Sequence, residues 1–121
     1  MAEAINRGWI DGDAATYYTN GINASLNFFG LEEGMVFNVG NVIGTSLGTT
    51  TISIADFMEN EQVVYKGNNA EGLEQILKQK FVSMWQNSGW EPFFNYRRTG
   101  IPAFSVGVGT NAQERIPLRW Q

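Results

Sequence analysis

Paired carboxylates are the first residues whose type and spacing could do chemistry. Glu32 and Glu33 are adjacent, and Glu59 and Glu61 are two positions apart. Glycoside hydrolysis requires two carboxyl groups about 5 to 9.5 Å apart, and closeness in sequence does not establish that separation. Solvated surface is the preferred interpretation of these four glutamates, and a carboxylate-dependent glycosidase is the third of three functional hypotheses.

The run Asp11-Gly12-Asp13 invites a calcium interpretation. A calcium loop needs further oxygen ligands at alternating positions, and Ala15 and Tyr17 supply no short one. Asp11 or Asp13 is better explained as a helix cap. The chain also lacks cysteine and histidine, which removes thiol nucleophiles, zinc-thiolate sites and the commonest general base. We therefore expect a non-enzymatic protein without a metal site or cofactor.

The four tryptophans could stack on the apolar face of a sugar ring. Trp85 falls within an amphipathic stripe and is predicted to be in the core, whereas Trp9 and Trp90 flank helix ends, where an aromatic often pins one element to the next. Trp120 lies near the C-terminus. Of the four, Trp9 is kept as a candidate ligand contact.

Arg97 and Arg98 could hold an acidic ligand, because the guanidinium group binds carboxylates in a bidentate manner. The favoured interpretation is structural: near a helix C-terminus a cation meets the negative end of the helix dipole. Both arginines are therefore assigned to a structural motif.

Composition limits the classes of partner. The 121 residues carry eight basic and twelve acidic side chains, a net charge of −4, and no basic run longer than two residues. A nucleic-acid partner is excluded on this ground. No window approaches the roughly 18 apolar residues of a membrane span, and the N-terminus lacks the pattern of a secretory signal. The chain as given is expected to be soluble.

The first third of the chain predicts two helices. Residues 2–7 are good helix formers followed by Gly8, and a capping aspartate precedes a second helix over 14–29 that stops at Gly30. One face of this second helix is predicted to pack against a neighbour; it comprises Ala14, Tyr18, Ile22, Ser25, Leu26 and Phe29. Gly21 lies mid-helix, which predicts close approach of another helix.

Residues 32–51 are rich in Gly, Thr and Asn and fit neither helical nor alternating spacing, so they are predicted to form a long loop. A short capped helix is expected over 53–58. Since binding residues concentrate on loops held by rigid helices, Asn41, Tyr65 and Asn68 join Trp9 as candidate ligand contacts.

Asn69 is predicted to cap the helix with the strongest amphipathic stripe, which ends near Asn87. The stripe consists of Leu73, Ile76, Leu77, Phe81, Met84 and Trp85. Ser88 and Glu91 have the spacing of a capping box for a further helix, although Pro92 could instead place the cap at Glu91. This helix stops at Gly100 and Pro102, and an extended tail follows.

Two separated segments carry a family resemblance. The later one comprises ILKQKFVSMW, GWEPFFNYRRTGIPAF and a closing ERIPLRWQ, and the earlier one is AEAINRGWIDGDAATYYTNGINASLNFFG. Together they resemble the carboxy-terminal region of the SusD/RagB family, outer-membrane nutrient-binding lipoproteins of Bacteroidota. The first two elements also resemble that family's last tetratricopeptide-type hairpin. Members are several times longer and begin with a lipoprotein signal and an acylated cysteine, so the resemblance implies a carboxy-terminal fragment.

The resulting fold prediction is all-α, with tetratricopeptide-like hairpins, long irregular loops and an extended tail. One unit, 1–121, is expected to divide into a helical hairpin (1–31), a loop region with one short helix (32–68), a helix pair with the YRRTG motif (69–100) and a tail (101–121). The structural motif residues are Trp90, Phe94, Tyr96, Arg97, Arg98, Gly100 and Pro102.

The resemblance implies oligosaccharide binding and nutrient uptake at the cell surface, together with a SusC-like TonB-dependent transporter. Membrane contact would come only through the lipid anchor of the longer protein. The alternative hypothesis is a tetratricopeptide-type scaffold that binds a protein. Because a repeat unit buries its faces against neighbours, exposed apolar surface is also expected.

Overall fold

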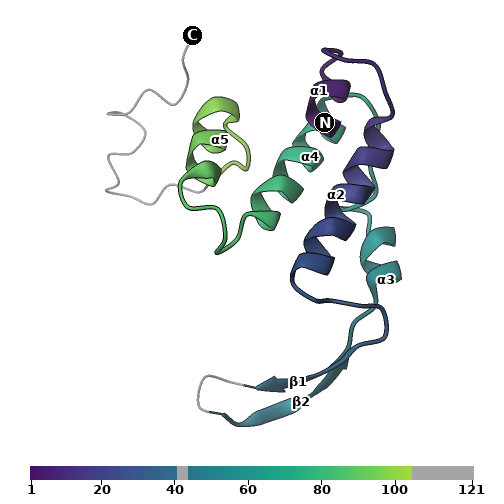
Figure 1. Ribbon diagram of the computed structural model, residues 1–121, viewed down its shortest axis with the longest axis vertical. Helices are drawn as coiled ribbons and strands as arrows, with labels where there is room; N and C mark the ends of the chain where they lie inside the picture. Colours follow the sequence, from purple (N-terminus) through teal and green to yellow (C-terminus); the bar gives the residue numbers. More distant parts are fainter. Residues whose placement is uncertain (41–43, 105–121) are drawn as a thin grey trace.

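The computed structural model describes residues 1–40 and 44–104 and contains helices and one small sheet. In chain order the elements are α1 (Ala2–Asn6), α2 (Ala14–Phe28), β1 (Val36–Gly40), β2 (Ser46–Thr51), α3 (Ile54–Glu59), α4 (Ala70–Ser83) and α5 (Glu91–Thr99). Helices α1, α2 and α4 pack on one another, and β1 and β2 project away from them (Figure 1). We call α1, α2, α4 and the segment 60–69 the helical body.

The core lies where α2 meets α4 and the segment before α4. Tyr18 and Ile22 of α2 pack with Val63 and Ile76, and all four are buried. The predicted packing face of α2 is confirmed at Ala14, Tyr18 and Ile22, whereas Phe29 is 48% exposed just beyond the helix. Burying these apolar side chains provides the main stabilisation of the helical body.

The N-caps of three helices are side chains: Asn69 as predicted, Asp13 rather than Asp11, and Ser53 at the start of the expected short helix. The side chains of Asp13, Ser53 and Asn69 accept hydrogen bonds from the first-turn amides of α2, α3 and α4, at 3.0, 3.2 and 2.8 Å. Each satisfies an amide that has no partner within its helix. A hydrogen bond from the Thr16 side chain, with backbone bonds from Thr16 and Ala15, lowers the pKa of Asp13.

The prediction of an all-α fold is wrong. Within the segment expected to be an irregular loop, β1 and β2 form an antiparallel hairpin in which Val36 faces Thr51 and Val39 faces Gly48, with a register shift between Val39 and Gly40. Val, Phe and Thr favour strands. Every residue of both strands is exposed, so neither face requires apolar side chains and the usual alternation is missing.

The tetratricopeptide-like description is not supported by the structure. The close approach predicted at Gly21 is also wrong, because a Cβ atom there would meet nothing within 4 Å. The close approach occurs at Gly72, in the first turn of α4, where a Cβ atom would overlap the carbonyl oxygen of Gly67.

The end of α4 differs from the prediction. The helix stops at Ser83, and Gln86 has a positive φ of 60°. Because the chain leaves the helix before Trp85, that side chain is 67% exposed, and its predicted place in the core is wrong. The predicted capping box is not formed either: Trp90 is the N-cap of α5 without a side-chain bond, and Pro92 lies in the first turn. Trp120 and most of the predicted tail lie outside the described residues.

Candidate functional site

Tyr65 and Asn68, two of the candidate contacts, lie three positions apart in the segment before α4 and are joined by a hydrogen bond. The Tyr65 hydroxyl donates to Asn68 Oδ1 at 2.9 Å and accepts from Asn6 Nδ2 of α1 at 2.8 Å. The same amide of Asn6 also donates to the carbonyls of Gly67 and Asn69, at 3.2 and 3.4 Å. The polar atoms of Tyr65 are therefore engaged in holding the segment before α4 against α1.

A second set of bonds fixes the same segment to α4. Gln75 Oε1 accepts from the Lys66 amide at 2.8 Å, while its Nε2 donates to the carbonyls of Gln62 and Val64 at 3.3 and 2.8 Å. From α2, the Tyr18 hydroxyl donates to the Val63 carbonyl at 2.7 Å. Burial raises the pKa of Tyr18, so its hydroxyl stays a donor. Three helices thus hold residues 62–66 in one conformation.

This fixed segment forms one wall of a groove of about 780 Å³, with α4 as the other wall and Phe57 of α3 among the lining residues. We call it the polar groove. Amides, carboxylates and ammonium groups line it, including Asn60, Gln62 and Gln79, and Val63 contributes the apolar part. Such a set can donate and accept hydrogen bonds with a polyhydroxylated ligand.

A second groove, of about 310 Å³, shares the lining residues Phe57 and Gln79 with the first. We call it the apolar groove. Tyr17, Ile22 and Leu26 of α2 and Val82 of α4 contribute to its lining. Exposed apolar surface was expected, and Val82 at 63% exposed is an example.

The other two candidate contacts are Trp9 and Asn41. Trp9 follows α1 and is 66% exposed, with the Arg7 guanidinium 5.3 Å from its ring centroid. Asn41 lies outside the described residues.

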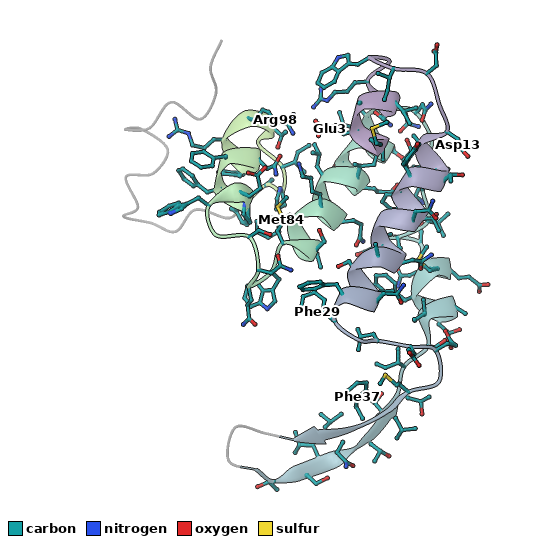
Figure 2. All side chains as sticks on the ribbon, in the orientation of Figure 1. Glu3, Asp13, Phe29, Phe37, Met84 and Arg98 are labelled. Atoms are coloured by element: carbon teal, nitrogen blue, oxygen red, sulfur yellow. The ribbon has the colours of Figure 1, made fainter. Side chains whose placement is uncertain are left out.

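Arg98 of the YRRTG motif clamps a carboxylate of the chain itself. Its two guanidinium nitrogens donate to the two oxygens of Glu3 at 2.7 and 3.0 Å, and Arg7 also donates to Glu3 at 3.0 Å. The labelled side chains of Glu3 and Arg98 in Figure 2 come from α1 and α5, at opposite ends of the described chain. A bidentate geometry of this kind is characteristic of arginine and carboxylate.

The pKa of Glu3 reflects two opposing effects. Burial of this carboxyl group raises its pKa, but the hydrogen bonds from Arg98 and Arg7 and the charges of both arginines lower it by more, so the net shift is downward. The pKa of Arg98 shifts in the opposite direction: its hydrogen bond to Glu3 raises it. The ion pair is therefore intact near neutral pH and ties α5 to α1.

The remaining motif residues are distributed between helix α5 and its exit. Tyr96 packs edge-on against Phe104 with ring centroids 4.8 Å apart, and Arg97 lies over the Phe93 ring at 5.7 Å. Gly100 caps the helix in the left-handed region with φ 70°, and the Ile101–Pro102 peptide is cis. Trp90 and Phe94 are 72% and 59% exposed, so these two aromatics lie at the surface.

One of the paired glutamates has a structural role that the sequence did not reveal. Glu33 Oε2 accepts from the amides of Ile54 and Ala55 at 2.7 and 3.1 Å, which places a carboxylate at the N-terminus of α3. The contact spans more than twenty residues of sequence, so no local cap pattern indicates it. Within 1–40 and 44–104, no group of three or more acidic side chains is placed to hold a metal ion.

Comparison with known families places the chain. Over residues 1–121 it matches the SusD-like family described as starch-binding and associating with the outer membrane. The chain belongs to this family, and the predicted relationship to SusD/RagB proteins is confirmed. Neither a curated protein nor a solved structure matched it. Among the described helices, none combines the length and apolar character needed to cross a membrane.

Proposed function

We propose that this chain binds an oligosaccharide at the bacterial outer membrane and serves nutrient uptake together with a SusC-type transporter. The observation that carries the proposal is the family match over residues 1–121, whose description names both starch binding and the outer membrane. The polar groove adds support, because its amides and carboxylates suit sugar hydroxyls.

The proposed activity is binding without chemistry on the glycan. Of the glutamate pairs considered for hydrolysis, Glu33 is occupied as a helix cap, and Glu59 and Glu61 are exposed.

The test is to incubate the purified chain with neutral and acidic oligosaccharides. Binding is measured by calorimetry, and the glycans are then analysed by chromatography for change in length. Saturable binding of at least one glycan with no shortening is the expected result. Release of shorter products, or no binding to any glycan, would contradict the proposal.

The transporter partnership needs a separate measurement. A tagged form of the chain is coexpressed with a SusC-type transporter, and the solubilised membranes are passed over an affinity resin. Coelution of the two in fixed ratio is expected, and elution of the chain alone would count against the partnership.

A further inference from the structure

We propose that the polar groove is the site at which this chain binds a neutral oligosaccharide, with Phe57 as the stacking surface. This inference rests on the proposed glycan-binding function and assigns it to particular residues. None of them belongs to the set that the sequence singled out as candidate contacts.

The groove has the size and the chemical groups that such a ligand needs. Its volume of about 780 Å³ falls within the range of roughly 300–1,000 Å³ typical of ligand sites. Phe57 is 40% exposed, so part of its ring is available to the apolar face of a sugar. Planar amides from Asn60, Gln62 and Gln79 lie in the same groove.

Several of these polar groups are available to a ligand. The side chains of Gln62 and Gln79 form no hydrogen bond with any other described residue, and Asn60 uses only Oδ1, which accepts from the Gln62 amide at 2.9 Å. Each side-chain amide offers two donors and an acceptor, which matches the dual character of a sugar hydroxyl.

The wall that presents these groups is already ordered without ligand. Gln75 holds the backbone of residues 62, 64 and 66 against α4, and Tyr18 holds Val63 from the buried side. Binding therefore requires little ordering of the backbone, and such preorganisation lowers the entropic cost of association.

The charges of the groove select against acidic glycans. Three glutamates and two lysines line it, and Lys78 is paired with Glu74 at 2.7 Å. The other charged side chains that line the groove are Glu61, Glu71 and Lys66. Two negative charges and one positive charge leave an excess of negative charge. The carboxylates of the groove would repel a uronic acid or a sulfated sugar. The hydroxyl groups of a neutral sugar can instead donate hydrogen bonds to these carboxylates.

Calorimetric titration of the whole chain tests this assignment, with maltoheptaose and a neutral xylo-oligosaccharide as neutral probes and an oligogalacturonate as the acidic one. Phe57→Ala is expected to weaken binding of the preferred neutral probe by about tenfold, the effect of losing one aromatic stacking contact. Gln62→Ala, which removes an exposed side chain and leaves the core intact, is expected to weaken it by about threefold. Phe37→Ala on β1 is the matched aromatic control and should bind like the parent chain.

The outcomes separate the two proposals. If the parent chain binds a neutral probe and both groove variants bind it equally well, the groove assignment is wrong while the glycan-binding function stands. If the oligogalacturonate binds more tightly than the neutral probes, the charge argument is overturned. If the parent binds no probe, both proposals fail. Circular dichroism of Phe57→Ala checks its fold, and should that variant unfold, Gln62→Ala alone decides the assignment.

Discussion

The helical body and the β1–β2 hairpin differ in how much apolar surface they bury. The helical body buries Tyr18, Ile22, Val63 and Ile76 together and fixes its connecting segment with side-chain hydrogen bonds. None of the residues of strands β1 and β2 is buried, and Phe37, labelled in Figure 2, lies on this projecting part of the chain. A two-stranded hairpin alone is only marginally stable. A binding surface that must be ordered in advance is therefore better built on the helical body.

The largest expected difference between the two regions comes from truncating a leucine. Leu77 of α4 is 3% exposed and Leu47 of β2 is 67% exposed. Leu77→Ala should lower the free energy of unfolding by about 2–5 kcal/mol because it leaves a cavity. Leu47→Ala should change it by less than about 0.5 kcal/mol. Urea unfolding followed by circular dichroism measures both, and equal losses would show that the hairpin shares the core's stability.

Two helical glycines give the next contrast. A Cβ atom at Gly72 would overlap the Gly67 carbonyl oxygen, whereas one at Gly21 would meet nothing within 4 Å. We expect Gly72→Ala to lower the free energy of unfolding by about 1–3 kcal/mol through overpacking. Gly21→Ala should raise it by about 0.4–1 kcal/mol, because alanine reduces the conformational entropy of the unfolded chain. The midpoints of thermal unfolding should move in opposite directions. A stabilising Gly72→Ala would mean that the segment 60–69 is not held against α4.

Loss of the Gln75 side chain should loosen the groove wall. Its three hydrogen bonds to residues 62–66 connect that segment to α4. Because its partners are exposed enough to bond water instead, Gln75→Ala should cost only about 1–2 kcal/mol. Hydrogen exchange should accelerate at the Lys66 amide and stay unchanged in β1 and β2. Unchanged exchange at Lys66 would contradict the role assigned to Gln75.

The smallest effect concerns Glu3 and its arginine partners. Because the folded pKa of Glu3 is lowered from 4.5, its ionised form stabilises the fold above that value, and the stabilisation is lost as the pH falls through the folded pKa. The pair is partly exposed, with Arg98 at 45%, so Glu3→Gln should cost less than about 1 kcal/mol near neutral pH.

This difference between Glu3→Gln and the parent chain should shrink as the pH falls from 4.5 through the lowered pKa of Glu3. Urea unfolding at several pH values measures the trend. Glu74→Gln, which breaks a pair exposed by about half on both sides, is the control and should cost less still. A difference that grows on acidification would contradict the downward shift in the pKa of Glu3.

Local signals explain which features could be predicted from the sequence. Asp13, Ser53 and Asn69 lie two or three positions from the amides that they cap, so the sequence pattern itself indicates the contact. The family relationship was likewise legible from the motifs around Tyr96 to Pro102. The hairpin was missed because strands without a buried face carry no alternating pattern.

Contacts between distant positions explain why the rest could not be predicted. Arg98 and Glu3 are 95 positions apart, and the Gln75 amide reaches backbone atoms 9 to 13 positions away. No periodicity connects such pairs. The polar groove exists only once α3, the segment after it and α4 have been brought together, so its lining residues do not form a sequence motif.

Hydrogen exchange measured with and without maltoheptaose, or with whichever neutral oligosaccharide calorimetry shows to bind, tests the central claim most directly. If the helical body and the end of α3 together carry the glycan site, amides in 57–66 and 71–79 should exchange more slowly with the glycan, while those of 36–40 and 46–51 should not change. Slower exchange confined to the hairpin, with residues 57–79 unaffected, would contradict the account.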